Sequence, residues 1–471
     1  MNENAAPAPP TEGAGGVPSD LQSAFIAAVA RQKAGDIAGA IKLYRRIIEL
    51  DPYSGDAYNN LANLLAGQQQ LLAAVACLRR AARLAPRSAT VFANLGNYLR
   101  LLGRFDEAAL TLGRALELDP DSAAVLFRFA LLLEDLGDGE HALAYFDRAI
   151  EKQPDSVEMR WTRALAQLRG GDFTRGFAGY EIRFQRPQTR IGHFTMPPWQ
   201  GESLVGRTIL VHTEQGFGDA LQFIRFMPRL AAMGARVLFS CPPEMMRLMT
   251  GFPGIAENLV HGAPMPGVVD FHVPILSLAH RLGITLETIP RAIPYLAPPA
   301  SVAGPPVPRA PDTRLAVGIA WAGNPKHTND ANRSMPLEQF FALTDLEGVA
   351  LYSLQKGARA ADLRALGFDA FVRDLDPGIA DFADLAAAIM ALDVIVSIDS
   401  APVHLAGALG RPTFVLLPAQ PDWRWMRGRD DTPWYSTLRL FRQSTPGDWA
   451  GVMERVRAAI AEMAAQPRER P

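Results

Sequence analysis

Apolar and polar positions follow two different patterns along this chain. Over residues 21–190 the apolar residues recur at helical spacing, with small and large side chains at fixed places, which predicts a series of helices. From Gly206 onwards, short apolar runs rich in β-branched residues alternate with helical stretches, which predicts a parallel sheet covered by helices. The chain therefore divides into a helical part and an α/β part.

The helical part repeats every 34 residues. Each unit has a terminal proline, a bulky residue eight positions before it, an alanine twelve before it and a small residue twenty-four before it. In order of unit these are Pro52, Pro86, Pro120 and Pro154; Tyr44, Leu78, Leu112 and Phe146; Ala40, Ala74, Ala108 and Ala142; Ala28, Ala62, Gly96 and Ala130. Small residues let two helices approach, large ones fill the gap between units, and proline ends the second helix. One unit cannot bury its own apolar face, so stacked units share a core.

This register resembles the tetratricopeptide-repeat family, with four units over residues 21–156. A fifth unit, near residues 157–190, is degenerate: it keeps Ala164, has Gly176 in place of the expected alanine and lacks the proline. We interpret it as the cap that joins the next domain. Such arrays form concave surfaces that bind proteins or peptides, and the alternative is a spacer or a dimer surface.

The α/β part contains six apolar runs that predict buried strands: residues 208–213, 236–241, 314–321, 349–354, 394–399 and 413–418. A helix is expected from Asp219 to about Met233, with a kink at Pro228. A proline-rich stretch at 298–312 predicts a semi-rigid connector between two halves. The expected domains are a disordered tail (1–20), the repeats (21–190), one Rossmann-like lobe (191–300), a linker (301–312) and a second Rossmann-like lobe (313–471).

Composition narrows the classes of function. A formal net charge of −2 gives no electrostatic case for binding nucleic acid or an anionic membrane. The two cysteines, Cys77 and Cys241, lie far apart and match neither a disulfide framework nor a zinc site. No apolar run approaches 18 residues, and residues 1–20 lack the pattern of a secretory signal. We therefore expect a cytoplasmic protein without a transmembrane segment or a bound metal.

The first motif is EQGFGDALQF, residues 214–223, between a predicted strand and a predicted helix. Gly216 and Gly218 allow a tight turn and a close approach of the backbone, and helix N-terminal amides favour a negative group. A dinucleotide fingerprint would need a small residue at Leu221, which argues against an NAD enzyme. Asp219 fits two interpretations, the N-cap of the helix or a catalytic carboxylate.

Three more motifs follow predicted strands. WAGNPKHTNDANRS, residues 321–334, offers four side chains that suit the binding of phosphate: Asn324, Lys326, His327 and Arg333. The alternative is a solvated loop. SLQKG, residues 353–357, offers Gln355 and Lys356 to a base or phosphate. SIDSAPVHLAGALGRP, residues 397–412, runs from a strand into a helix and presents four candidates: Asp399, Ser400, Ala401 and His404. Amides from Ser400 onward suit an anion, whereas His404 also fits a packed helix histidine.

Taken together, these motifs resemble the heptosyltransferase-type glycosyltransferases of the GT-B fold and, more distantly, the O-linked N-acetylglucosamine transferases. The resemblance covers about residues 195–465, and GFGD and DSAPVHLAGALGRP carry most of it. The chain as a whole also resembles bacterial proteins that fuse tetratricopeptide repeats to such a domain, which implies an α-solenoid of these repeats followed by an α/β GT-B domain of two Rossmann-like lobes. The resemblance also implies metal-independent, base-assisted displacement from a nucleotide-sugar donor, with no cofactor. In the family pattern Asp219 is the general base, Lys326 binds donor phosphate, and the 399–404 stretch forms the donor-binding loop and helix.

The repeats are absent from heptosyltransferases and favour a protein acceptor. The function predicted from the sequence is thus a glycosyltransferase whose repeats recruit a protein. Two alternatives stay open: a protein-interaction scaffold with a non-catalytic transferase-like domain, and a transferase directed at lipopolysaccharide or polysaccharide. The sequence does not identify the sugar, the nucleotide base or the acceptor.

Overall fold

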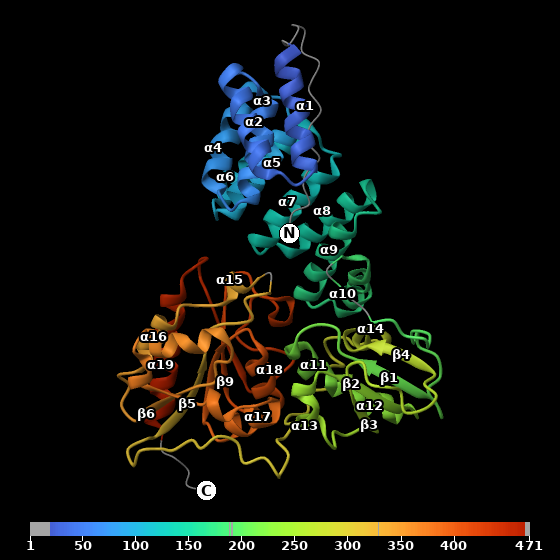
Figure 1. The fold of residues 1–471 in the computed structure, drawn as a ribbon, viewed down its shortest axis with the longest axis vertical. Helices are drawn as coiled ribbons and strands as arrows, with labels where there is room; N and C mark the ends of the chain where they lie inside the picture. The colour runs from blue at the N-terminus through green and yellow to red at the C-terminus, as the bar shows by residue number, and fades with distance from the viewer. Residues whose placement is uncertain (1–18, 188, 190–191, 328, 467–471) are drawn as a thin grey trace. The chain divides into compact units, whose positions relative to one another are not determined.

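The computed structural model describes residues 19–187, 189, 192–327 and 329–466 (Figure 1). It divides into two compact units, one ending at Ala166 and one beginning at Gln167. The predicted disordered tail falls almost entirely on residues 1–18, which lie outside the described residues. The first helix already begins at Ser19.

The first unit is an array of antiparallel helices, as the 34-residue register predicts. Its first eight helices are α1 (Ser19–Lys33), α2 (Ile37–Leu50), α3 (Gly55–Gly67), α4 (Leu71–Leu84), α5 (Ala89–Leu101), α6 (Phe105–Leu118), α7 (Ala123–Asp135) and α8 (Gly139–Lys152). The alanines and bulky residues of the register are fully buried, and each terminal proline follows the second helix of its pair by two residues. At Gly96 even an alanine would be too large, because its Cβ would lie 2.5 Å from Cγ of Leu112.

The degenerate fifth unit spans the boundary between the two compact units. It comprises α9 (Val157–Arg169), α10 (Phe173–Tyr180) and the 3-10 helix η1 (Glu181–Gln185). Gly176 replaces the expected alanine because a Cβ there would lie 2.7 Å from the Leu168 side chain. The end of α9, all of α10 and η1 belong to the α/β unit.

The second unit contains two separate parallel sheets. The four-stranded sheet has the order β3-β2-β1-β4, and the six-stranded sheet has the order β10-β9-β8-β5-β6-β7. The strands are β1 (Thr208–His212), β2 (Arg236–Cys241), β3 (Glu257–Val260), β4 (Phe271–Pro274), β5 (Leu315–Ala320), β6 (Val349–Ser353), β7 (Val372–Asp374), β8 (Val394–Ile398), β9 (Thr413–Leu417) and β10 (Leu438–Arg442). This confirms the predicted fold class, a helical array followed by two Rossmann-like lobes, and all six predicted strands.

Mostly short helices connect the strands of both lobes, and the longer α19 follows the last strand. The α-helices are α11 (Phe217–Phe223), α12 (Met227–Ala232), α13 (Met246–Met249), α14 (Leu278–Arg281), α15 (Asp330–Arg333), α16 (Asp362–Ala365), α17 (Phe382–Met390), α18 (Ala401–Ala408) and α19 (Trp449–Ala465). The single helix predicted for residues 219–233 is instead broken into α11, a 3-10 turn (Ile224–Phe226) and α12. Pro228 lies in the first turn of α12, where a missing amide hydrogen costs no helical hydrogen bond.

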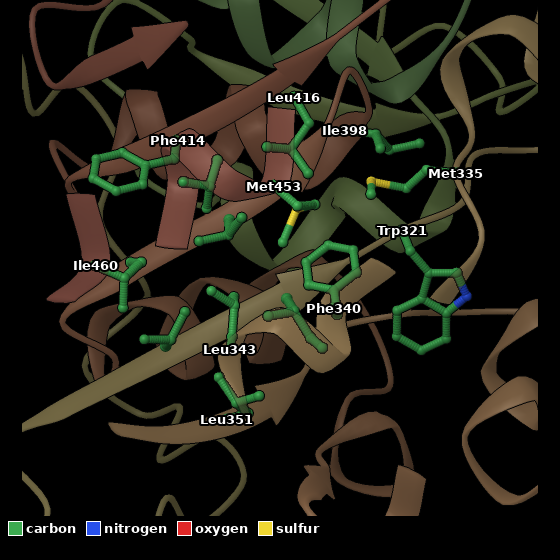
Figure 2. Close-up of a cluster of buried hydrophobic side chains, with 14 of the residues drawn as sticks. Trp321, Met335, Phe340, Leu343, Leu351, Ile398, Phe414, Leu416, Met453 and Ile460 are labelled. Atoms are coloured by element: carbon green, nitrogen blue, oxygen red, sulfur yellow. The ribbon is translucent and has the colours of Figure 1, made fainter. Parts of the chain in front are cut away.

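The core of the second lobe lies between the six-stranded sheet and α19. Figure 2 shows this cluster, in which Phe414 and Leu416 of β9 face Met453 and Ile460 of α19. Trp321, directly after β5, is fully buried at its edge. The packed sheet fixes the loops at the carboxyl ends of β5, β6 and β8, which carry three of the sequence motifs.

Candidate functional site

The two lobes meet where α11 packs against α18. Each helix follows the carboxyl end of a strand, β1 in one lobe and β8 in the other, the place where ligands bind in such sheets. Gly218 allows this contact, because a Cβ there would lie 2.7 Å from Cδ2 of His404. The GFGD and DSAPVHLAGALGRP motifs, 186 residues apart at these two positions, thus come together.

Asp219 lies at this junction with both carboxylate oxygens engaged. Oδ2 accepts a hydrogen bond from the Gly216 amide at 2.9 Å, and Oδ1 is ion-paired with the Arg424 guanidinium. The N-cap interpretation is wrong in position: Gly216 is the N-cap of α11, and Asp219 is its third helical residue, reaching back to the cap amide. The sequence suggested that amides at the start of this helix bind an anion. In the structure the Asp219 carboxylate itself accepts the hydrogen bond of the Gly216 amide. Burial raises the pKa of Asp219, and the Arg424 charge opposes that rise.

Arg424 joins the two lobes, and the sequence analysis missed it. Its guanidinium contacts Asp219 and Gln222 of the first lobe, with Nε 2.8 Å from Oε1 of Gln222, and Asp422 of its own loop at 2.7 Å. The side chain is 9% exposed. Its signal in the sequence is a loop dense in tryptophan and arginine, residues 421–427, directly after the apolar run that forms β9.

Asp399 and His404 face each other across the start of α18. Nε2 of His404 lies 4.0 Å from Oδ1 of Asp399, and Nδ1 lies 3.0 Å from the Tyr435 hydroxyl. Burial and then the nearby Asp422 raise the pKa of Asp399 to about 6. Burial and then the Arg424 charge lower the pKa of His404 to about 3, so this histidine is neutral at pH 7. It is packed, as one interpretation held, and stacks on Trp425.

Ser400 and Ala401 form the N-terminus of α18. Ser400 is the N-cap, but its hydroxyl donates to the Ile398 carbonyl at 3.2 Å and makes no capping bond. Arg333 reaches the same place, because its Nη1 donates to the carbonyl of Asp399 at 3.1 Å. This corner of the second lobe therefore gathers a helix N-terminus and a guanidinium, a combination that suits an anion.

Asn324 and Lys326 lie on an exposed loop after β5. The Lys326 amide donates to Oδ1 of Asn324 at 3.0 Å, which fixes the turn of the loop. Lys326 lines a surface cavity of 1080 Å³, together with His327, Arg359 and Trp449 among others. A cavity of that size can hold a ligand as large as a nucleotide.

Gln355 and Lys356 are engaged by the protein itself. Both ends of the buried Gln355 amide bond to backbone: Oε1 accepts from the amides of Trp321 and Ala322, and Nε2 donates to the carbonyls of Ala322 and Lys356. Lys356 is ion-paired with Asp376 and donates to the Ile379 carbonyl at 2.7 Å. In this structure both side chains fix the loops after β5 and β6.

The degenerate fifth repeat supports the turn directly before Asp219, a role that no sequence motif indicates. Arg183 of η1 is fully buried and pairs twice with Glu214, at 3.0 and 2.9 Å. Tyr180 contacts Gln215 through its hydroxyl at 3.4 Å. Phe177 of α10 packs edge-on against Trp423, the neighbour of Arg424. The degenerate fifth repeat is therefore built into the junction.

Titration of Asp399 should appear in the stability of the protein. The pKa of Asp399 in the folded protein is raised from 3.8 to about 6, so the protonated carboxyl is the form that stabilises the fold. This stabilisation is fully present below the unfolded pKa of 3.8 and is lost as pH rises through 6. Asn cannot titrate, so the stability of Asp399→Asn relative to wild type should rise by about 3 kcal/mol between roughly pH 4 and pH 8. Urea unfolding at both pH values measures this, and parallel pH profiles would contradict it.

Asp422→Asn provides the contrasting variant. Burial acts to raise the pKa of Asp422, but the charge and hydrogen bonds of Arg424 outweigh it and lower that pKa overall. Its contribution is therefore present above the ordinary aspartate pKa and is lost as pH falls. Asp422→Asn loses this contribution but also removes the charge that raises the pKa of Asp399. With rising pH it should therefore gain less stability relative to wild type than Asp399→Asn does.

Comparison with known proteins identifies the helical part. Tetratricopeptide-repeat models match residues 25–74, 59–123 and 99–168, which confirms the predicted repeats. Protein FlbA of Caulobacter vibrioides is 28% identical over 337 residues, covering 65% of this chain and 55% of FlbA. The chain thus spans about half the length of that relative. The present chain combines N-terminal tetratricopeptide repeats with a C-terminal α/β region.

Solved structures with similarity to the chain cover about a third of it. TTC0263, a thermophilic tetratricopeptide-repeat protein of Thermus thermophilus, is 20% identical, with a TM-score of 0.33 over 36% of this chain and 92% of its own. PilF of Pseudomonas aeruginosa is 21% identical, with a TM-score of 0.32 over 35% of this chain and 75% of its own. Among the described residues, no helix is long and apolar enough to cross a membrane.

Proposed function

We propose that the α/β unit is a glycosyltransferase that uses a nucleotide-sugar donor. The observation that carries the proposal is the junction of α11 and α18. There the Asp219 carboxylate of the first lobe is ion-paired with the Arg424 guanidinium of the second lobe, and α11 packs against α18, whose N-cap is Ser400. Both helices follow the carboxyl ends of strands in the two parallel sheets. The heptosyltransferase-like motifs at the same residues support the same chemistry.

In this proposal the second lobe holds the donor. The amides at the start of α18, Arg333 and Lys326 neutralise the diphosphate, and the cavity beside Lys326 takes the nucleoside. An acceptor hydroxyl attacks the anomeric carbon while Asp219 takes its proton. The bond between the anomeric carbon and the phosphate oxygen breaks, and its electron pair leaves with the nucleoside diphosphate. Asp219 must first exchange its bond to Arg424 for the acceptor hydroxyl.

The repeats serve to recruit a protein acceptor in the same proposal. The domain limits that accompany it are 21–190 for the repeats, 191–300 and 313–471 for the lobes, and 301–312 for the linker. The structure adds one refinement, since residues from Gln167 already pack with the α/β unit.

A second candidate is a protein-interaction scaffold whose α/β unit does not catalyse. The observation that favours it is that both oxygens of Asp219 are already bonded, to Gly216 and to Arg424. The two candidates differ in donor turnover: a transferase hydrolyses or transfers its donor, whereas a scaffold leaves it intact. Product analysis with a panel of nucleotide sugars therefore separates them.

Lys326→Ala should weaken the binding of nucleoside diphosphates by about tenfold or more, because it removes one charge-assisted contact to phosphate. Lys326 is exposed and makes no side-chain hydrogen bond to a described residue, so the melting temperature of the free protein should not change. The measurement is the thermal shift with a panel of nucleoside mono- and diphosphates. A ligand at 100 times its dissociation constant adds about 2.7 kcal/mol.

Lys33→Ala is the matched control, since Lys33 is an exposed lysine at the end of α1. It should bind nucleotides as the wild type does. Equal affinities of wild type and Lys326→Ala would place the donor phosphates elsewhere.

A further inference from the structure

A second cavity, of 650 Å³, lies beside the edge strand β10 and helix α19. It shares no lining residue with the cavity at Lys326. Its lining contains two carboxylates, Asp430 and Glu462, and four guanidinium groups: Arg429, Arg439, Arg442 and Arg455. The lining therefore carries an excess of positive charge in a protein whose net charge is −2.

The backbone holds two of these arginines in place without neutralising them. Arg442 donates from Nη2 to the Trp425 carbonyl at 2.5 Å and from Nε to the Arg429 carbonyl at 3.0 Å. Arg455 donates to the Arg442 carbonyl at 2.5 Å. A carbonyl accepts a hydrogen bond but supplies no counter-charge, so these bonds position both side chains without neutralising them.

The four arginines differ in whether they form an ion pair with a carboxylate. Arg429 is paired in bidentate fashion with Asp431. Within the described part of the chain, Arg439, Arg442 and Arg455 form no ion pair, and Arg439 lies over the Phe441 ring at 4.9 Å. Burial and then the neighbouring Arg429 lower the pKa of Arg442 to about 10, and the charge of Asp430 opposes this shift only in part. Like charges held this close repel one another, and an anion between them removes the repulsion.

We propose that this cavity binds a small phosphate-bearing anion of the pyrophosphate class. Guanidinium groups match the geometry of phosphate oxygens and bind them in pairs, which a lysine cluster would not do. Three arginines that form no ion pair within the described residues come from a strand and a helix and line this cavity. Together with Arg429 they outnumber its two carboxylates, Asp430 and Glu462, which suits a compact multivalent anion. This site is separate from the proposed donor site and does not depend on the transferase proposal.

The test is calorimetric titration of the full-length protein with pyrophosphate, at low and at physiological salt. The double variant Arg439→Gln/Arg455→Gln removes two exposed charges and should lower the affinity about a hundredfold, at about tenfold for each charge-assisted contact. Arg373→Gln is the matched control, because Arg373 is an exposed arginine on the edge strand β7. It should bind within about twofold of the wild type.

Lys326→Ala separates the two cavities, and the pyrophosphate affinity of this site should survive that change. The proposal is overturned if the wild type does not bind pyrophosphate, if the double variant binds equally well, or if Lys326→Ala alone abolishes binding. A parallel arm uses vesicles containing phosphatidylserine: binding to vesicles without binding of free pyrophosphate would also overturn it. The melting temperature of each variant confirms that it is folded, and Arg439→Gln alone replaces the double variant if that one unfolds.

Discussion

Deletion of residues 19–156 is expected to abolish transfer to the natural acceptor while sparing hydrolysis of the donor. The array would act by raising the local concentration of acceptor at the α/β unit, an effect that reaches about a hundredfold or more for linked binding modules. The rate of donor hydrolysis should not change, because the residues proposed to hold the donor all lie beyond Gln167. Rates of donor hydrolysis and of transfer to the acceptor, measured side by side, test this.

The structure dictates where the deletion must stop. It should leave α9, α10 and η1 in place, since Arg183 and Tyr180 hold Glu214 and Gln215 directly before the Asp219 turn. A longer deletion, through residue 187, is the contrasting variant. It leaves Glu214 buried without its guanidinium, a change that costs about 3–5 kcal/mol for a buried pair, and donor hydrolysis should be lost as well.

Undiminished transfer by the shorter deletion would show that the array does not recruit the acceptor. Loss of donor hydrolysis in both deletions would point instead to a structural role of α1–α8 for the α/β unit. The two deletions therefore separate recruitment from support.

The parts of the fold that the sequence predicts best are those with a strict pattern. The repeat register depends on side-chain size at fixed spacing, and Ala40, Tyr44 and their equivalents are fully buried as that spacing requires. Strands β5, β8 and β9 are buried along their whole length, so they appear as continuous apolar runs. Strands β3, β4, β7 and β10 were missed because they are short or interrupted by exposed residues such as Arg439.

Only the part of the candidate site that lies in local motifs could be predicted from the sequence. Gly218 and the start of α18 belong to local motifs, in which a strand, a turn and a helix follow one another. Arg424 contacts Asp219 across 205 positions of sequence, and Arg183 reaches Glu214 across 31. Neither contact corresponds to a periodic pattern or a fixed spacing in the sequence, because each arises only when distant elements pack together. Burial of the whole cluster, which moves the pKa of Asp399 and His404, arises in the same way.

Asp219→Asn is expected to lower the turnover of the transferase by about a hundredfold or more, because the amide cannot take the proton of the acceptor hydroxyl. Donor affinity should stay close to that of the wild type, since the proposed donor contacts come from the second lobe. Asparagine still offers an oxygen to the Gly216 amide, so α11 keeps its N-terminal bond. Turnover and donor affinity are measured separately, by saturation kinetics and by calorimetry.

Arg424→Gln is the companion variant that separates the base from its partner. In the wild type, burial raises the pKa of Asp219 and Arg424 opposes the rise. Without Arg424 the pKa of Asp219 should rise further, so the acid limb of the rate profile should move to higher pH while activity at alkaline pH persists. Asp219→Asn should instead lose that limb and stay slow at every pH. Near-normal turnover in Asp219→Asn would reduce this carboxylate to a structural bridge between α11 and Arg424, and the scaffold candidate would then account better for the junction.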